Sequence, residues 1–89
     1  MDIRKIGQYK KSPILNYGFC VADKEAYKFL VNWCEKTFGK TKSYNPRHKY
    51  PPRWAHRSKF RLSYGNFIGY GYLYFGNEDD AMAFKLMWA

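Results

Sequence analysis

The sequence predicts a small α+β domain, residues 1–89, in which two helices cover one face of an antiparallel sheet in the order β-α-loop-β-β-α. Three stretches support this fold class. Residues 66–75 form an uncharged alternating strand, residues 24–38 have the apolar spacing of an amphipathic helix, and residues 77–80 are an acidic helix start. The closest common architecture is a ferredoxin-like half-circuit without its last strand.

The predicted central strand, residues 66–75, is rich in aromatic residues and contains no proline. Successive side chains of a strand point to opposite faces, so its tyrosines and its glycines face opposite ways. We expect helices to cover the glycine face, because glycine lets another element approach closely. The alternative buries the tyrosines and leaves the glycine face open. The two sets are Ile68, Tyr70, Tyr72 and Tyr74 on one face, and Phe67, Gly69, Gly71, Leu73 and Phe75 on the other.

The N-terminal half is expected to hold one strand and one helix. Residues 1–12 form either an arm or an edge strand, and residues 14–21 are typical of a first strand. Asp23 is a suitable N-cap for the helix at residues 24–38, and Gly39 is a suitable stop. Apolar residues recur on one face of this helix at Tyr27, Leu30, Val31, Cys34 and Phe38.

The C-terminal half begins with a loop and ends with a helix. Prolines exclude an ordinary helix or central strand within residues 40–59, so we predict a long basic, aromatic loop there. Residues 60–64 alternate like a second strand, and the Gly-Asn pair at 65–66 is the expected turn into the central strand. Asn77 is the expected N-cap of the last helix, with Asp80 at the capping-box position.

Composition limits the class of protein. A hydrophobic fraction of 46% with 21% aromatic residues argues against disorder, and 89 residues can build one small core. Cys20 and Cys34 are too few and too far apart for a disulfide framework. We expect buried, reduced thiols, with a single disulfide as the alternative. The sequence contains no membrane-span or signal-peptide pattern, so we expect a cytoplasmic protein without a membrane partner.

Positive charge is concentrated in the middle of the chain. Residues 36–77 contain five lysines, four arginines and no Asp or Glu, which equals the formal charge of +9 of the whole chain. Lysine and arginine neutralise phosphates, and the aromatic residues interleaved with them can stack on unpaired bases. The residues expected to contact a ligand are Lys40, Lys42, Arg47, Lys49, Arg53, Trp54, Arg57, Lys59 and Arg61, together with Tyr70 and Tyr72 of the central strand.

The C-terminal segment resembles a known group of proteins. Residues 74–88 contain the patterns Y-F-x-N, D-D-A and F-K-L-x-W, and they are similar to the ends of small uncharacterised proteins of tailed bacteriophages. The resemblance implies a phage protein made in the cytoplasm of a bacterial host. It does not include the basic segment, and it transfers no catalytic or binding residue.

No catalytic residue, metal site or cofactor is expected. His48 and His56 have no carboxylate or cysteine near them in the sequence, which disfavours a metal site. Cys20 and Cys34 lie on apolar faces, and no serine stands in a nucleophile-elbow motif. The acidic residues at 78–80 are explained by the start of a helix, and no phosphate-binding glycine loop is present.

The sequence therefore predicts a non-enzymatic nucleic-acid-binding module with a preference for single strands. Its basic loop and an exposed tyrosine face would form the contact surface. The alternative is a small phage-type inhibitor that docks the same loop on an acidic surface of a host protein, because Arg, Tyr and Trp also dominate protein interfaces. A third interpretation is a solvated loop that only keeps the protein soluble.

Overall fold

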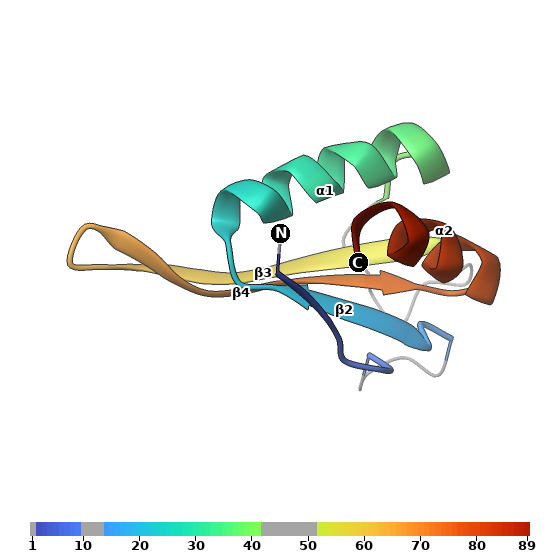
Figure 1. Cartoon of the computed structure of the whole chain (residues 1–89), viewed down its shortest axis with the longest axis horizontal. Coiled ribbons are helices and arrows are strands. Elements are labelled where there is room, and N and C mark those ends of the chain that lie inside the picture. The colour runs from blue at the N-terminus through green and yellow to red at the C-terminus, as the bar shows by residue number, and fades with distance from the viewer. Residues whose placement is uncertain (1, 10–13, 42–51) are drawn as a thin grey trace.

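The computed structural model describes residues 2–9, 14–41 and 52–89, and within them two helices lie on one face of a four-stranded antiparallel sheet (Figure 1). The predicted α+β class and the β-α-loop-β-β-α order are confirmed. The strands are β1 (Ile3–Lys5), β2 (Tyr17–Val21), β3 (Trp54–Ser63) and β4 (Asn66–Phe75), and the helices are α1 (Lys24–Phe38) and α2 (Glu78–Trp88).

The strand order in the sheet is β1-β2-β4-β3, with every neighbouring pair antiparallel. Strand β4 is central, as predicted. Its residues 71–75 pair with β2, and its whole length pairs with β3. Strand β1 lies beside β2, at the edge where a ferredoxin-like sheet has its last strand. The N-terminal segment therefore includes an edge strand, and it completes the half-circuit that the sequence predicted.

Three predicted boundaries in the strands were wrong. Strand β3 begins at Trp54 rather than Phe60, and β2 begins at Tyr17 rather than Ile14. The turn of the β3–β4 hairpin is Tyr64-Gly65, because Ser63 pairs with Asn66. Both turn residues have positive φ angles, 50° and 80°, which is the type I′ geometry favoured in two-residue hairpins.

Helices cover the glycine face of β4, as predicted. Leu73 and Phe75 are fully buried there beneath both helices. The Tyr27 ring of α1 lies directly on Gly71, where an added Cβ would come within 2.1 Å of a ring carbon. Phe67 is the exception on this face, with 51% of it exposed, because the hairpin extends beyond α1 (Figure 1). Gly71 therefore allows the close approach of a helix that the sequence indicated.

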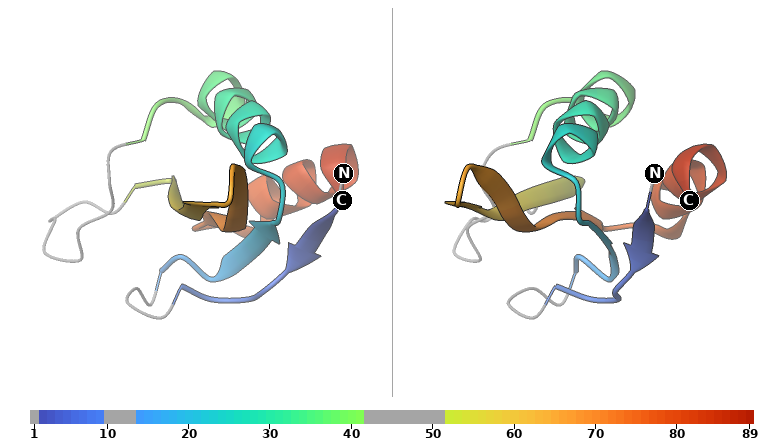
Figure 2. Two further views of the ribbon diagram at one scale, coloured as in Figure 1. Left: turned by 90° about the vertical axis from the view of Figure 1, so that its left-hand side faces the viewer. Right: turned by 60° about the vertical axis from the view of Figure 1, so that its left-hand side comes forward.

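The opposite face of the sheet is covered only at one end. Residues 6–9 run along β2 and then over this face (Figure 2). The Tyr9 ring packs on Tyr74 with 4.8 Å between centroids. Tyr74, Ala55 and Leu15 form a second small core there, and each is at most 8% exposed. The tyrosine face is therefore neither fully open nor the main core.

Helix ends follow the predicted capping pattern. The Asp23 side chain accepts a hydrogen bond from the Glu25 backbone at 2.9 Å, and Gly39 ends α1 with a positive φ of 95°. The Asn77 side chain accepts a hydrogen bond from the Asp80 backbone at 2.8 Å and donates one to the Asp80 carboxylate at 2.9 Å. These contacts satisfy backbone donors at the first turn of each helix.

Both cysteines are buried free thiols in the structure. Cys34 lies in the main core, whereas Cys20 is the cross-strand neighbour of Tyr72 and so lies on the opposite face of the sheet. Burial, together with the negative charge of Asp80, raises the pKa of Cys34 to about 12. The sheet separates the two thiols, which agrees with the expectation of reduced cysteines.

Replacing Leu30 by Ala is expected to lower the free energy of unfolding by about 2–5 kcal/mol, because Leu30 is fully buried between α1 and the sheet. Urea titration measures this loss. The exposed Lys36 on the same helix is the control, and Lys36→Ala should change stability by less than about 0.5 kcal/mol. A loss below that value for Leu30→Ala would show that the core is packed differently.

Acid is expected to weaken the contact between α2 and β3. Hydrogen bonds from Arg53, and a further one from Asn77, hold the pKa of Asp80 below its usual value of 3.8. The Asp80 carboxylate therefore stabilises the fold fully above pH 3.8, and this contribution is lost as the pH falls further. Asp80→Asn should be less stable than the wild type at neutral pH, and the difference should shrink below pH 3.8. A difference that stays constant on acidification would contradict this assignment.

Candidate nucleic-acid interface

The face of the sheet turned away from the helices, here called the open face, carries two parallel rows of side chains. Arg57, Lys59 and Arg61 of β3, the basic row, are all exposed. Their cross-strand partners on β4 are Tyr72, Tyr70 and Ile68, respectively. Directly opposite residues of an antiparallel pair point to the same face at about 4.5–5.5 Å between Cβ atoms. Each cation of the basic row therefore stands beside an aromatic or apolar side chain.

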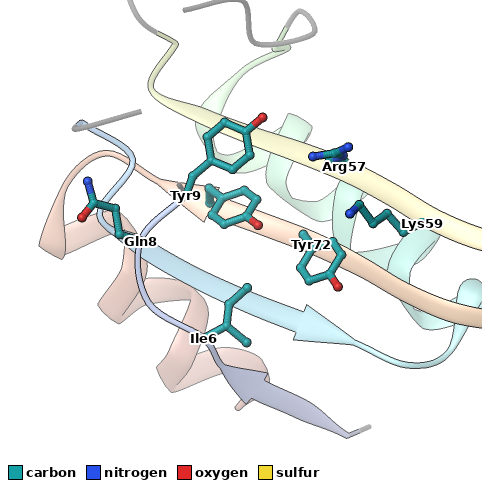
Figure 3. Close-up of a pocket in the computed structure, with 7 residues that line it drawn as sticks. Ile6, Gln8, Tyr9, Arg57, Lys59 and Tyr72 are labelled. Atoms are coloured by element: carbon teal, nitrogen blue, oxygen red, sulfur yellow. The ribbon is translucent and has the colours of Figure 1, made fainter. Parts of the chain in front are cut away.

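A groove of about 390 Å³ lies at the covered end of this face (Figure 3). Arg57 and Lys59 line one side, and Tyr72 forms the floor. Tyr74 also lines the groove. The other side comes from the N-terminal segment, which contributes Ile6, Gln8 and Tyr9. A hydrogen bond from the Ile6 backbone to the Gly18 carbonyl, at 2.8 Å, and one from the Tyr9 backbone to the Leu15 carbonyl, at 2.9 Å, hold this segment in place.

Exposure of the tyrosines increases from the groove toward the hairpin tip. Tyr74 is 8% exposed, Tyr72 is half-buried, and Tyr70 is 43% exposed. The rings of Tyr72 and Tyr74 are nearly parallel, with 12° between planes and 6.3 Å between centroids. Burial raises the pKa of Tyr74, and the neighbouring Tyr72 and Tyr9 raise it further. The Tyr74 hydroxyl therefore stays neutral at neutral pH.

Trp54, one of the residues expected to contact a ligand, is a core residue in the structure. Its side chain is 1% exposed, and its indole nitrogen donates to the Gly39 carbonyl at 2.7 Å. His56, the next residue on the same face, stacks on Trp54 and shares a hydrogen bond of 2.8 Å with the Tyr27 hydroxyl. Burial lowers the pKa of His56, which favours its neutral form. His56 is therefore a packing neighbour of α1 and does not belong to the open face.

Arg53 is held by the protein itself. Its Nε and Nη2 donate to the two carboxylate oxygens of Asp80 at 2.6 and 2.7 Å, a bidentate pair that joins the start of β3 to α2. The guanidinium fork that the sequence assigned to phosphate is thus occupied by Asp80. Lys40 is exposed just after α1. The remaining predicted contacts, Lys42, Arg47 and Lys49, lie outside the described residues.

Two features of the open face were missed in the sequence. Arg57, Lys59 and Arg61 alternate with a period of two, which is the spacing of one face of a strand, but the predicted loop extended over the first two. The wall at residues 6–9 depends on pairing between β1 and β2, and no local pattern predicts it. The alternation of basic residues across the end of the predicted loop could have indicated that these residues share one face of a strand.

Comparisons of the chain with protein-family models, with curated proteins and with solved structures find no match. Among the described residues, no group of three His, Cys, Asp or Glu side chains is arranged to hold a metal ion. In the same part of the chain, neither helix combines the length and the apolar character that crossing a membrane requires. These comparisons assign no function, and the open face is the surface that combines exposed cations with aromatic rings.

Proposed function

We propose that the protein is a non-enzymatic nucleic-acid-binding module that uses the open face of its sheet. The observation that carries this proposal is the basic row of β3 lying beside Tyr70 and Tyr72 of β4. Arginine and lysine bind phosphate oxygens, and tyrosine rings stack on unpaired bases. RNA-recognition modules likewise present aromatic residues on the exposed face of a four-stranded sheet, although this likeness concerns architecture only.

The groove supports a preference for single strands. Tyr72 lines the groove beside the N-terminal wall, so a base must leave its own stack to reach this ring. The bases of a duplex are paired and stacked, and their faces are covered by neighbouring bases. Phosphates of either form could contact the basic row, but the tyrosine rings can contact only unpaired bases.

Neutralising the basic row should reduce both the affinity for nucleic acid and its dependence on salt. The variant Arg57→Gln, Lys59→Gln, Arg61→Gln removes three phosphate contacts, which should lower the steepness of log affinity against log salt by about 2. Fluorescence anisotropy with a labelled oligothymidylate at several salt concentrations measures this change. The control Lys28→Gln, Lys36→Gln, Lys85→Gln removes the same charge from the exposed helix surfaces. Equal losses in the two variants would contradict a specific interface.

A protein partner is the second candidate function, and the β3–β4 hairpin favours it. Leu62 and Phe67 are cross-strand partners that are 65% and 51% exposed, and Tyr64 at the turn is fully exposed. Apolar and aromatic side chains of this kind are common in protein interfaces. Leu62 and Phe67 lie on the face of the sheet opposite the basic row, so a host protein that contacts both sets would have to enclose the hairpin. Affinity for plain oligonucleotides in the absence of any host protein separates the two candidates.

We further propose that the protein acts in the cytoplasm of a bacterial host as a phage product. The resemblance of residues 74–88 to proteins of tailed bacteriophages supports this origin. The free, buried thiols of Cys20 and Cys34 are consistent with a reducing compartment. Expression in the cytoplasm and in the periplasm, followed by thiol titration of the protein unfolded without reductant, tests whether an oxidising compartment converts these cysteines to disulfides.

A further inference from the structure

The two rows of the open face run in the same direction, along the strands. Residues two apart in an antiparallel strand are about 6.8 Å apart, since each residue rises about 3.4 Å. The basic row therefore repeats at a distance comparable to the separation of consecutive phosphates in an extended strand. The side chains of β4 repeat at the same distance, one strand away. Each cross-strand pair thus offers one cation for a phosphate and one side chain for a base.

A path across the sheet offers no such series. From Arg57, the next residues across the face are Tyr72 and then Cys20, which is buried. The Gly18 backbone of β2 is covered by the Gly7 carbonyl, which would lie 2.2 Å from an added Cβ. Beyond Gly71 toward the hairpin tip, β2 no longer pairs with β4. A ligand crossing the strands would therefore meet one cation and one tyrosine, then the buried Cys20. It would reach a second cation only at Arg4 of β1, which pairs with Asp2 at 3.9 Å.

The groove ends the row of pairs on one side. At the pair of Ala55 and Tyr74, both residues are buried beneath Tyr9 and Leu15, so the accessible face begins with Arg57 and Tyr72. From there it continues through Lys59 and Tyr70 to Arg61 and Ile68. The last of these pairs offers an apolar side chain, 40% exposed, rather than a ring. The accessible face thus presents three cation–apolar pairs in line.

We propose that the ligand is an extended single strand that lies along β3 and β4 and binds with one nucleotide at each of these three pairs. Its phosphates contact the basic row, and its bases lie over Tyr72, Tyr70 and Ile68. The base at one end enters the groove beside Tyr9, and the other end points toward the hairpin tip. This inference rests on the proposed function and adds the direction, the spacing and the length of the bound segment.

Paramagnetic labels on a short oligonucleotide test the direction. Trithymidylate with a 5′-phosphate is prepared with a nitroxide at its 5′ end or at its 3′ end, and amide signals of the isotopically labelled protein are recorded. One label should broaden signals around Arg57 and Tyr72, and the other should broaden signals around Ser63 and Asn66. If one label broadens signals of β1 and the other broadens signals of β3, the oligonucleotide crosses the sheet and the inference is wrong. If both labels broaden the signals at both ends of the β3–β4 pair equally, the oligonucleotide has no fixed direction, and the inference is again wrong.

The same samples distinguish failure of this inference from failure of the proposed function. Absence of any signal change with unlabelled trithymidylate at low salt, repeated with oligomers of ten thymidines, would overturn both. Binding across the strands, or without a fixed direction, would overturn only the proposed alignment of the oligonucleotide along β3 and β4. A blunt-ended duplex, compared with the ten-thymidine oligomer at equal phosphate concentration, should compete about tenfold or more weakly, because its paired bases cannot stack on Tyr70 and Tyr72. Equal competition by the duplex would contradict the placement of bases over β4.

Discussion

Replacing Trp54 by Ala is expected to lower the free energy of unfolding by about 3–5 kcal/mol, as truncation of a large buried aromatic side chain does. Trp54 is 1% exposed and lies in the main core. Its indole nitrogen bonds the Gly39 carbonyl at 2.7 Å, and its own carbonyl accepts from the Thr41 hydroxyl at 2.6 Å. The substitution leaves a cavity and also loosens the junction between the end of α1 and the start of β3. A loss of this size is a large share of the total stability of a small domain.

Two comparisons separate this core role from a ligand-stacking role. Trp54→Phe keeps most of the buried apolar volume and loses the indole donor, so its cost should be smaller, about 1 kcal/mol. Oligonucleotide affinity of Trp54→Phe, measured well below its melting temperature, should match the wild type. If Trp54→Ala instead keeps its stability and loses affinity for oligonucleotides, Trp54 serves ligand binding rather than the core.

Elements with a strong local pattern were predicted well from the sequence. The helix at 24–38 and the strand at 66–75 have the predicted bounds, because apolar periodicity and capping residues act within a few positions of each other. The prediction that helices cover the glycine face also followed from residues within β4. By contrast, the start of β3 depends on pairing with the far end of β4, and the role of β1 depends on an unpaired edge of β2. Such pairings are not encoded in neighbouring residues.

The candidate site was predicted in part for the same reason. Alternation in β4 placed Tyr70 and Tyr72 on the face opposite the helices, and the charge distribution pointed to Arg57, Lys59 and Arg61. Sequence spacing could not show that Arg53 would be held by Asp80, which is distant in the chain. It also could not show that residues 6–9 would cover Tyr74 and build a groove. These contacts are made by tertiary packing, and they decide which cations and rings remain accessible.

Replacing Tyr70 and Tyr72 together by Ala is expected to weaken single-strand binding by about 2–6 kcal/mol, at about 1–3 kcal/mol for each stacked base. Both side chains lie on the open face beside Lys59 and Arg57. Tyr70 is 43% exposed and Tyr72 is half-buried, so the fold should lose much less stability than in Trp54→Ala. The salt dependence should hardly change, because no phosphate contact is removed. Anisotropy titrations and thermal melts of the same samples measure the two effects.

The matched control for this pair is Tyr70→Phe, Tyr72→Phe, which keeps both rings and removes only the hydroxyls. Its affinity should stay near that of the wild type if stacking carries the binding. Leu73→Ala is the buried reference, since Leu73 is fully buried, whereas Phe67 is 51% exposed and unsuited to that purpose. If the double Ala variant melts as early as Leu73→Ala and loses binding only in proportion to unfolding, the tyrosines serve the fold. The basic row would then remain as the candidate contact surface.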